Sequence, residues 1–477
     1  GIFSAGVEEC CAIVSIGEGN RIEPNIRATM QPLYDGLVAN SQGGWPSLKW
    51  DLGVIPGWFS RFLPTGFYYK TFMWPDWKWF ENLVRRMAAV APVPAGTEHD
   101  LYDKRHAHCD LLIIGGGPAG LAAALAAARS GRKIILADDQ PGPGGALLWD
   151  RARVDGMAGP DWADRTGDQL RALENVTLLS RTTVVAAWDH GYFTAVQHND
   201  ASGSAASTQT LWRIRADKTI LASGAIERPL VFPNNDRPGI MLADSARQYI
   251  NRYAARPGNT TVIYTNNNSA YRTALDLQEK GVTIAAVVDV RDKIPGELAR
   301  RIRELGISVF KGYEISGTRG YSRVDQVAIR PTPGNPVRSS RQHKLGCDLL
   351  CISGGWDPTL HLLSQAGGKL DYSEHLACLV PRKDQPAQAA DIRAVGSANG
   401  CFELAGCLAE GHAAGLELSG QAGGEVGDTI VAPASTGQNE AYGIKAYWQT
   451  TPPYRGRQWV DRLHDVTSSS INVANRE

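Results

Sequence analysis

The chain has 477 residues, 43% of them hydrophobic, and its 49 basic and 49 acidic residues cancel to a net charge of zero. This length favours two or three globular domains, and the neutral balance excludes binding driven by attraction to nucleic acid or an anionic membrane. Eight cysteines with no C-x-x-C pair argue against a zinc ribbon, an iron–sulfur loop and a thioredoxin-type redox pair. The cysteine usage and the lack of a signal-peptide pattern predict a reduced, cytoplasmic protein.

The first 103 residues are not expected to form a complete domain. The chain begins at Gly1 without a methionine, and we expect residues 1–40 to be the remnant of a truncated N-terminal domain. Residues 41–103 form an aromatic arm and linker, with six of the 13 tryptophans between Gln42 and Phe80. Frequent proline and glycine prevent a regular helix or central strand in the arm. Its rings should therefore pack either on the chain's own domain or on a partner subunit.

The most informative stretch runs from Leu111 to Asp139. An apolar run is followed by glycines in G-x-G-x-x-G spacing, an alanine-rich segment and a second apolar run. This order predicts strand, tight turn, helix and strand, which is the start of a dinucleotide-binding unit. The glycines permit the turn, the approach of a pyrophosphate and close helix packing, and the helix N-terminus attracts the phosphates. Asp138 closes the second strand about 20 residues further on, where an acid binds ribose hydroxyls.

Further turns of small residues are expected beside this unit. A glycine-rich loop follows Asp139, and a buried strand ending at Leu221 leads into Ala222, Ser223 and Gly224. A later strand over 392–395 should join the same sheet before another glycine turn. Small residues at strand ends let the backbone approach a bound dinucleotide. The predicted cofactor-binding residues are Gly115, Gly117, Pro118, Ala119, Gly120, Asp138, Asp139, Gly144, Gly145, Ser223, Gly224, Gly396 and Asn399.

The sequence offers no catalytic constellation and predicts no metal site. No nucleophile with a base, and no redox disulfide, stands out. His106, His108 and Cys109 lie close together, but they lead straight into a buried strand and have no fourth ligand. The catalytic residues therefore stay unassigned.

A second unit of strand, helix and strand is expected within residues 256–340. The predicted elements are Thr261–Thr265, Ala270–Lys280 and Thr283–Val288. Three asparagines, at 266–268, stand where glycine would let a phosphate approach. Asparagine tolerates positive φ and can cap a helix, so the fold should survive. We expect a Rossmann-like insert whose nucleotide site is empty or degenerate.

Together these elements predict an α/β protein with a two-dinucleotide-binding-domain, flavoprotein-like (Rossmann) fold. The main domain should be discontinuous, over 104–255 and 341–420, with a smaller Rossmann-like domain inserted at 256–340. Residues 421–477 should be a linker or the truncated start of another domain.

Several segments resemble the α subunits of heterotetrameric bacterial sarcosine oxidases. The resemblance covers most of the chain, and its most specific parts are the aromatic arm and GAIERPLVFPNNDRPGIM; YTNNNSAYRTALDL and VGSANGCFELAGCLAEGHAAG add to it. In that family the α subunit holds noncovalent NAD⁺ in a two-dinucleotide-domain fold, and flavins on or against the β subunit oxidise sarcosine. The resemblance implies that this chain lacks most of the N-terminal ferredoxin-like domain and the C-terminal folate-binding half.

The function implied by this resemblance is an NAD⁺-binding α subunit in a complex that oxidatively demethylates sarcosine or another N-methyl amino acid. Its partners would be smaller subunits and a flavin-bearing β subunit, with no nucleic acid and no membrane. Asp138 would repel a 2′-phosphate, which favours NAD⁺ over NADP⁺.

Four alternatives stay open. FAD could fill the main site, where Asn399 stands in place of the acid that flavin-binding chains of this architecture usually carry. The chain could be an FAD-dependent NAD(P)H oxidoreductase, which needs a competent second site. It could be the α subunit of an opine or amino-acid dehydrogenase complex, or a structural subunit whose nucleotide only stabilises the fold.

Overall fold

The computed structural model describes most of the chain beyond residue 100 and scattered parts before it. The described residues are 13–19, 22–28, 31, 33–44, 46–47, 50, 52, 72–87, 90–91, 101–199, 207–335, 342–382, 391–420, 432–436, 442–462 and 466–475.

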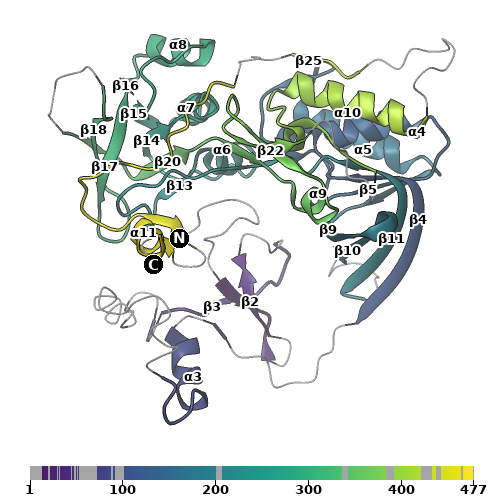
Figure 1. Ribbon diagram of the computed structural model, residues 1–477, viewed down its shortest axis with the longest axis horizontal. Coiled ribbons are helices and arrows are strands. Elements are labelled where there is room, and N and C mark those ends of the chain that lie inside the picture. Colours follow the sequence, from purple (N-terminus) through teal and green to yellow (C-terminus); the bar gives the residue numbers. More distant parts are fainter. Residues whose placement is uncertain are drawn as a thin grey trace.

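The main domain is built on a seven-stranded sheet (Figure 1). Its parallel strands are, in spatial order, β8 (Val176–Leu179), β5 (Ile134–Ala137), β4 (Tyr102–Ile114), β11 (Gln209–Leu221) and β24 (Ile392–Ala394). Antiparallel β10 (Tyr192–His198) and β9 (Thr182–Trp188) extend the sheet along the first half of β11. This order places the turn after β4 beside the end of β11, at the carboxyl edge where α/β sheets bind ligands. The predicted fold class is confirmed.

Helices cover one face of this sheet. The antiparallel hairpin of β9 and β10 and a short helix cover the other. Apolar residues of α4 (Pro118–Ala128), α5 (Gly159–Arg171) and α10 (Leu404–Leu418) form one core with the sheet. On the opposite face, side chains of β9–β11 pack with α9 (His361–Gln365). The two glycines of α10 that face α4 allow very close packing: a Cβ at Gly411 would lie 2.0 Å from the carbonyl oxygen of Ala119.

The second domain contains a five-stranded parallel sheet. Its spatial order is β13 (Ile240–Leu242), β20 (Leu349–Ser353), β14 (Thr260–Thr265), β15 (Thr283–Asp289) and β16 (Val309–Lys311). One face packs on α6 (Ala243–Asn251), α7 (Ala270–Glu279) and α8 (Glu297–Glu304). The other packs on an antiparallel sheet of β17 (Tyr313–Arg319), β18 (Gln326–Pro331) and β19 (His343–Gly346), and on Tyr447 and Trp448.

Two features of this architecture differ from the sequence-based expectation. Strands β13 and β20 belong to the second sheet, although they lie outside the insert expected at 256–340. A short, fully apolar strand carries no information about which of two parallel sheets it joins. The buried strand expected to end at Leu221 is the 13-residue strand β11, which begins at Gln209. The chain crosses between the domains through β12 (Ala225–Glu227) and β21 (Trp356–Pro358), which pair antiparallel.

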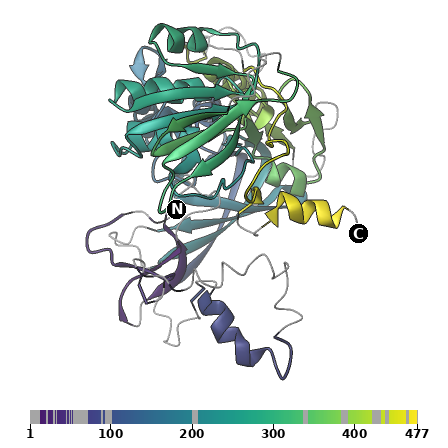
Figure 2. The same ribbon diagram turned by 90° about the vertical axis from the view of Figure 1, so that its left-hand side faces the viewer.

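The N-terminal part lies on one side of these two domains in both views (Figures 1 and 2). It contains a three-stranded sheet of β1 (Ile13–Ile16), β2 (Glu23–Arg27) and β3 (Ala39–Ser41), followed by α3 (Lys78–Met87). In the arm, Trp45 and Trp58 lie outside the described residues. The side chains of Trp74 and Trp79 are 85% and 78% exposed.

Short elements complete the fold. They are η4 (Gly145–Leu148), β6 (Arg153–Val154), β7 (Met157–Ala158), η5 (Asp189–Gly191), β22 (Leu370–Ser373), β23 (Cys378–Pro381), η6 (Gly396–Asn399), β25 (Ser435–Thr436), β26 (Trp459–Asp461), β27 (Val466–Thr467) and α11 (Ser468–Ala474). Among the described residues, none of the helices combines the length and apolarity needed to span a bilayer.

Candidate dinucleotide-binding site

The glycine turn between β4 and α4 leaves space above the helix N-terminus. Gly115 and Gly120 are required by the packing of the protein itself, since a Cβ at either would lie within 2.3 Å of a backbone oxygen. Gly117 differs, because a Cβ there would meet only the Cα of Gly145, at 4.0 Å. Gly117 is the N-cap of α4 and makes no side-chain capping bond. The first N–H groups of α4 therefore face open space of the kind that a pyrophosphate fills.

Asp138 stands at the end of β5 with its carboxylate turned to this space. Its Oδ2 accepts a hydrogen bond from the Gly116 N–H and its Oδ1 accepts one from the Gln140 N–H, at 2.5 and 2.8 Å. A carboxylate has about four acceptor positions, so two remain for ribose hydroxyls. Burial raises the pKa of Asp138 to about 6, and the neighbouring Asp139 acts in the same direction. The carboxylate is thus ionised at neutral pH, and the residues present fit a dinucleotide.

The turn and Asp138 form one end of a cavity of about 690 Å³. Nine of the predicted site residues line it: Gly115, Gly117, Pro118, Ala119, Asp138, Asp139, Gly145, Ser223 and Gly224. Ser223 is fixed by a hydrogen bond of 2.6 Å from its hydroxyl to the carbonyl oxygen of Thr359. The structure therefore brings the glycine turn, the second loop and the turn after β11 to one cavity.

Four predicted residues lie behind the cavity wall. Gly120 packs against the backbone of β4, and the N–H of Gly144 donates to the carbonyl oxygen of Gly116 at 2.7 Å. Gly396 and Asn399 both donate to the carboxylate of Glu410, at 2.9 and 3.2 Å. Gly396 and Asn399 are therefore hydrogen-bonded to α10, and neither is among the residues that line the cavity; their contact with a ligand stays a prediction. Their neighbours Val395 and Ser397 line the cavity instead.

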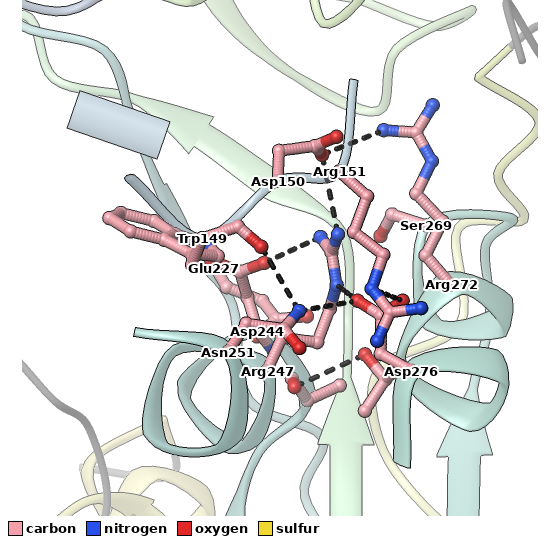
Figure 3. Close-up of polar contacts among 12 residues, drawn as sticks. Trp149, Asp150, Arg151, Glu227, Asp244, Arg247, Asn251, Ser269, Arg272 and Asp276 are labelled. Carbon is pink, nitrogen blue, oxygen red and sulfur yellow. Dashed lines mark hydrogen bonds and ion pairs between the residues drawn. The ribbon is translucent and has the colours of Figure 1, made fainter. Parts of the chain in front are cut away.

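Charged side chains at the inner end of the cavity were not identified from the sequence (Figure 3). Arg247 on α6 is 8% exposed and contacts three carboxylates: Asp276 at 2.8 Å, Asp244 at 3.1 Å and Asp150 at 3.3 Å. The lining residues from this cluster and the loop beside it are Trp149, Asp150, Glu227, Asp244, Arg247, Ser269 and Arg272. These residues come from separate segments of the chain, and no sequence motif links them.

The cluster joins the two domains. Asp150 of the main domain contacts Arg247 and Arg272 of the second domain, the latter at 3.6 Å. Arg151 contacts Asp276 at 3.3 Å and also pairs with Glu279. Burial opposes ionisation of Asp150, but Arg247 and Arg272 outweigh it and lower its pKa. The two domains are therefore held together by buried and partly buried ion pairs beside the cavity.

Glu227 is the buried acid of this region. The Asp244 N–H donates to its Oε2 at 2.8 Å. Burial, together with the nearby Asp244, raises the pKa of Glu227 to about 8. Both effects favour the protonated carboxyl group, which can donate a hydrogen bond.

The turn of the second unit is occupied by the chain itself. Residues 442–450 cross it, with Ile444 bridged to Asn267. The side-chain amide of Asn266 donates to the carbonyl oxygen of Lys445 at 3.1 Å, and the Asn268 N–H donates to that of Gly443 at 3.1 Å. These two groups of the turn are therefore already hydrogen-bonded to residues 443–445, and Asn268, Ser269 and Arg272 beside them line the cavity.

The acidic residue of the second unit, Asp289, is also hydrogen-bonded within the protein. Asp289 lies at the end of β15, where Asp138 lies in the first unit, but it is fully buried. It accepts hydrogen bonds from the Tyr271 hydroxyl at 2.9 Å, from the Arg291 side chain at 2.7 and 3.0 Å, and from the Arg291 N–H at 2.9 Å. Asp289 has no acceptor position left toward a ribose. Within the part of the chain that the structure describes, no group of histidine, cysteine and acidic residues is arranged to hold a metal.

Comparison with known proteins agrees with this geometry. The profile of the pyridine nucleotide-disulphide oxidoreductase family matches residues 109–383, and the chain belongs to this family of oxidoreductases. Its fold therefore binds FAD or NAD(P).

Individual relatives give more detail. The chain is 39% identical to the α subunit of the sarcosine oxidase of Rhizobium meliloti, over all of this chain and 47% of that protein. It is 25% identical to an opine oxidase subunit of Agrobacterium tumefaciens, over 76% of this chain and 74% of the relative. The sarcosine oxidase α subunits that it resembles are about twice its length. The thioredoxin reductase of T. acidophilum shares the fold, with a TM-score of 0.51, 19% identity, and coverage of 66% of this chain and 99% of the reductase.

Proposed function

We propose that this chain is the NAD⁺-binding α subunit of a sarcosine-oxidase-like complex, in which a flavin on a partner β subunit oxidises an N-methyl amino acid. The observation that carries this proposal is the contrast between an open first unit and a closed second unit. Within the described residues, only the first unit combines an open turn with a free acid for a ribose, whereas hydride transfer from NAD(P)H to a bound FAD requires two such sites.

The residues of the first unit have separable roles in this proposal. The N–H groups at the start of α4 would hold the pyrophosphate, and Asp138 would accept hydrogen bonds from the adenosine ribose. When bound, the nicotinamide ring supplies a hydride acceptor. Glu227, whose protonated form burial favours, would offer a hydrogen-bond donor to the bound nucleotide.

The exposed rings of the arm support a role in a multi-subunit complex. Trp74 and Trp79 are joined by Met73 and Leu83, which are 58% and 55% exposed. Large apolar side chains gathered on one short helix and its approach are typical of protein–protein contacts. We propose that Trp74, Trp77 and Trp79 lie within or beside the contact with the partner subunit.

The first experiment identifies the nucleotide. The chain is purified without added cofactor, denatured, and its released small molecules are identified by mass spectrometry. We expect NAD⁺ in near-stoichiometric amount and no FAD. Recovery of FAD in its place would overturn the NAD⁺ assignment, and recovery of neither would overturn the nucleotide-binding role.

A second experiment tests the oxidase assignment. The chain is coexpressed with the products of the adjacent reading frames, and the copurifying complex is assayed for peroxide formation with sarcosine and, in parallel, with opines. Sarcosine-dependent peroxide supports the proposal. Opine-dependent oxidation without sarcosine turnover would favour the opine oxidase alternative, for which the similarity to the Agrobacterium tumefaciens protein is the relevant observation.

A further inference from the structure

Two cysteines stand together at the start of α10, beside the cavity. Cys401 precedes the helix and Cys407 lies in its first turns. The Cys407 thiol donates a hydrogen bond to the carbonyl oxygen of Cys401 at 3.1 Å, and the Cys401 thiol donates one to the carbonyl oxygen of Glu403 at 3.8 Å. The backbone holds the approach in place, because the Cys407 N–H donates to the Glu403 carbonyl oxygen at 2.9 Å.

Gly406 makes this approach possible. A Cβ at Gly406 would lie 2.3 Å from the sulfur of Cys401 and within 4 Å of no other atom beyond its immediate chain neighbours and helix backbone. The other glycines of α10 that meet a close neighbour, Gly411 and Gly415, face the backbone of α4. Gly406 therefore has a different effect: it admits the Cys401 sulfur to the position next to Cys407.

The two thiols differ in reactivity. Cys401 is partly exposed, and the neighbouring Cys407 thiol lowers its pKa against the opposing effect of burial. Cys407 is buried, and its interaction with Cys401, together with burial, raises its pKa. A low-pKa exposed thiol beside a buried thiol is the arrangement in which one sulfur attacks an oxidant and the other resolves the product. The remaining described cysteines, all buried with pKa values raised by burial, are Cys109, Cys347, Cys351 and Cys378.

The pair is part of the cavity wall. Cys407 lines the cavity, and its sulfur lies 3.8 Å from the hydroxyl of Ser397, which lines it too. A Cβ at Gly396 would lie 2.8 Å from the Cβ of Ala119 and 3.4 Å from the Cys407 sulfur. A displacement of the Cys407 side chain would therefore disturb the packing next to the first turn of α4, where the phosphates are expected.

We propose that Cys401 and Cys407 form a redox-active dithiol that hydrogen peroxide converts to a disulfide, and that this oxidation alters nucleotide binding in the adjacent cavity. The Cys401 thiolate attacks one peroxide oxygen, the O–O bond breaks, and hydroxide leaves as Cys401 becomes a sulfenic acid. The Cys407 sulfur then attacks the Cys401 sulfur, the S–OH bond breaks, and water leaves with the Cys407 proton. In total, two thiols and one peroxide give one disulfide and two waters.

The source of peroxide in the cell rests on the proposed oxidase function, but the test does not. A chain with Cys10→Ser and Cys11→Ser is treated with one equivalent of hydrogen peroxide, and thiols are blocked and counted after denaturation. We expect the free thiols to fall by two and peptide mapping to give a Cys401–Cys407 cross-link. The nucleotide dissociation constant should change at least threefold and recover when dithiothreitol is added.

Variants keep the result specific. Cys401→Ser should abolish both the cross-link and the change in affinity, and Cys407→Ser should leave Cys401 as a sulfenic acid that a dimedone probe traps. Cys378→Ser should behave as the parent. Gly406→Ala should slow cross-linking at least tenfold. Oxidation of Cys401 without a cross-link in the parent chain, a cross-link between other cysteines, or an unchanged nucleotide affinity after cross-linking would each overturn the proposal.

Discussion

The two dinucleotide-type units of this chain share a backbone plan and differ in what occupies their turns. In the first unit, Gly117 leaves open space and Asp138 keeps acceptor positions free. In the second, Asn266–Asn268 bind residues 443–447, and Asp289 is saturated by Tyr271 and Arg291. The comparison teaches that the turn of a strand–helix–strand unit can satisfy its hydrogen-bonding groups with the protein's own polar groups.

The largest expected effect separates stability from binding in the second unit. Asp289→Ala leaves the Arg291 guanidinium buried without its carboxylate, and loss of one partner from a buried pair costs about 3–5 kcal/mol. Denaturant unfolding should show this loss, and calorimetry on the folded fraction should show unchanged nucleotide affinity. Weaker nucleotide binding by folded Asp289→Ala protein would show that a ligand binds at the second unit. It would contradict the contrast between the two units.

A substitution in the first unit should have the opposite outcome. Gly117→Val should fill the space reserved for phosphate and weaken nucleotide binding at least about 100-fold, or about 2.8 kcal/mol at 1.4 kcal/mol per decade. Its unfolding free energy should stay close to that of the parent, because a Cβ at Gly117 meets no protein atom nearer than 4.0 Å. Gly142→Val, in the neighbouring loop with no atom within 4 Å, is the matched control. Equal affinity in the two variants would show that no phosphate occupies the turn.

Asp138 should set the choice of nucleotide. Asp138→Ala should weaken NAD⁺ binding by about 1–3 kcal/mol, the scale of a hydrogen bond to a charged group. The unmodified chain should bind NAD⁺ more tightly than NADP⁺, because the carboxylate repels a 2′-phosphate. Isothermal titration with both nucleotides measures both effects. Equal affinity of the unmodified chain for the two would contradict the placement of the ribose at Asp138.

Between pH 3.8 and about 6, the contribution of Asp138 to the stability of the free chain should fall as the pH rises, whereas nucleotide affinity should rise. Burial raises the pKa of Asp138 from 3.8 to about 6 in the folded chain, so its contribution to stability is present below pH 3.8 and is lost as the pH rises through 6. A ribose that hydrogen-bonds the ionised form should instead bind about tenfold more weakly for each pH unit below 6. Asp138→Asn should flatten both profiles. A nucleotide affinity that stays constant from pH 5 to 7 would rule out this role of the carboxylate.

The smallest effect on the folded chain concerns the arm. Trp74→Ser with Trp79→Ser should change the unfolding free energy by no more than about 0.5 kcal/mol, since both rings are exposed. The unmodified isolated chain should self-associate in sedimentation experiments, and binding of the flavin-bearing partner should shift its tryptophan emission to the blue. The double variant should lose both properties. A monomeric parent chain with fully buried tryptophan emission would remove the case for an interface at the arm.

The sequence predicted the first unit well because each of its features is local. Leu111–Asp139 contains the strand, the turn, the helix and the acid in one short stretch. The strand, helix and strand of the second unit were also predictable, because the periodicity and the asparagine turn are local features. The segment that covers the asparagine turn could not be predicted, since residues 442–450 lie far away in the sequence and carry no motif.

The rest of the cavity depends on contacts between distant segments. Arg247 meets Asp150 and Asp276, which are separated from it by 97 and 29 positions. No spacing rule connects such residues. Asn399 shows the same limit at short range: its position at the end of a strand indicated the ligand, but Glu410, on the neighbouring helix α10, accepts its hydrogen bond instead.

The covering of the second turn by residues 442–450 has a consequence for synthesis of the chain. A ribosome produces the strands of the second sheet well before these residues, so the asparagine turn first forms with water on its donors. Domains fold largely in the order in which they emerge, yet this domain can be completed only after β24 has closed the main sheet. The second domain, which begins later in the chain, is thus enclosed by the main domain, which begins earlier. A pause in translation before residue 442 would hold back a nascent chain whose first nucleotide site is already formed and whose second is still open.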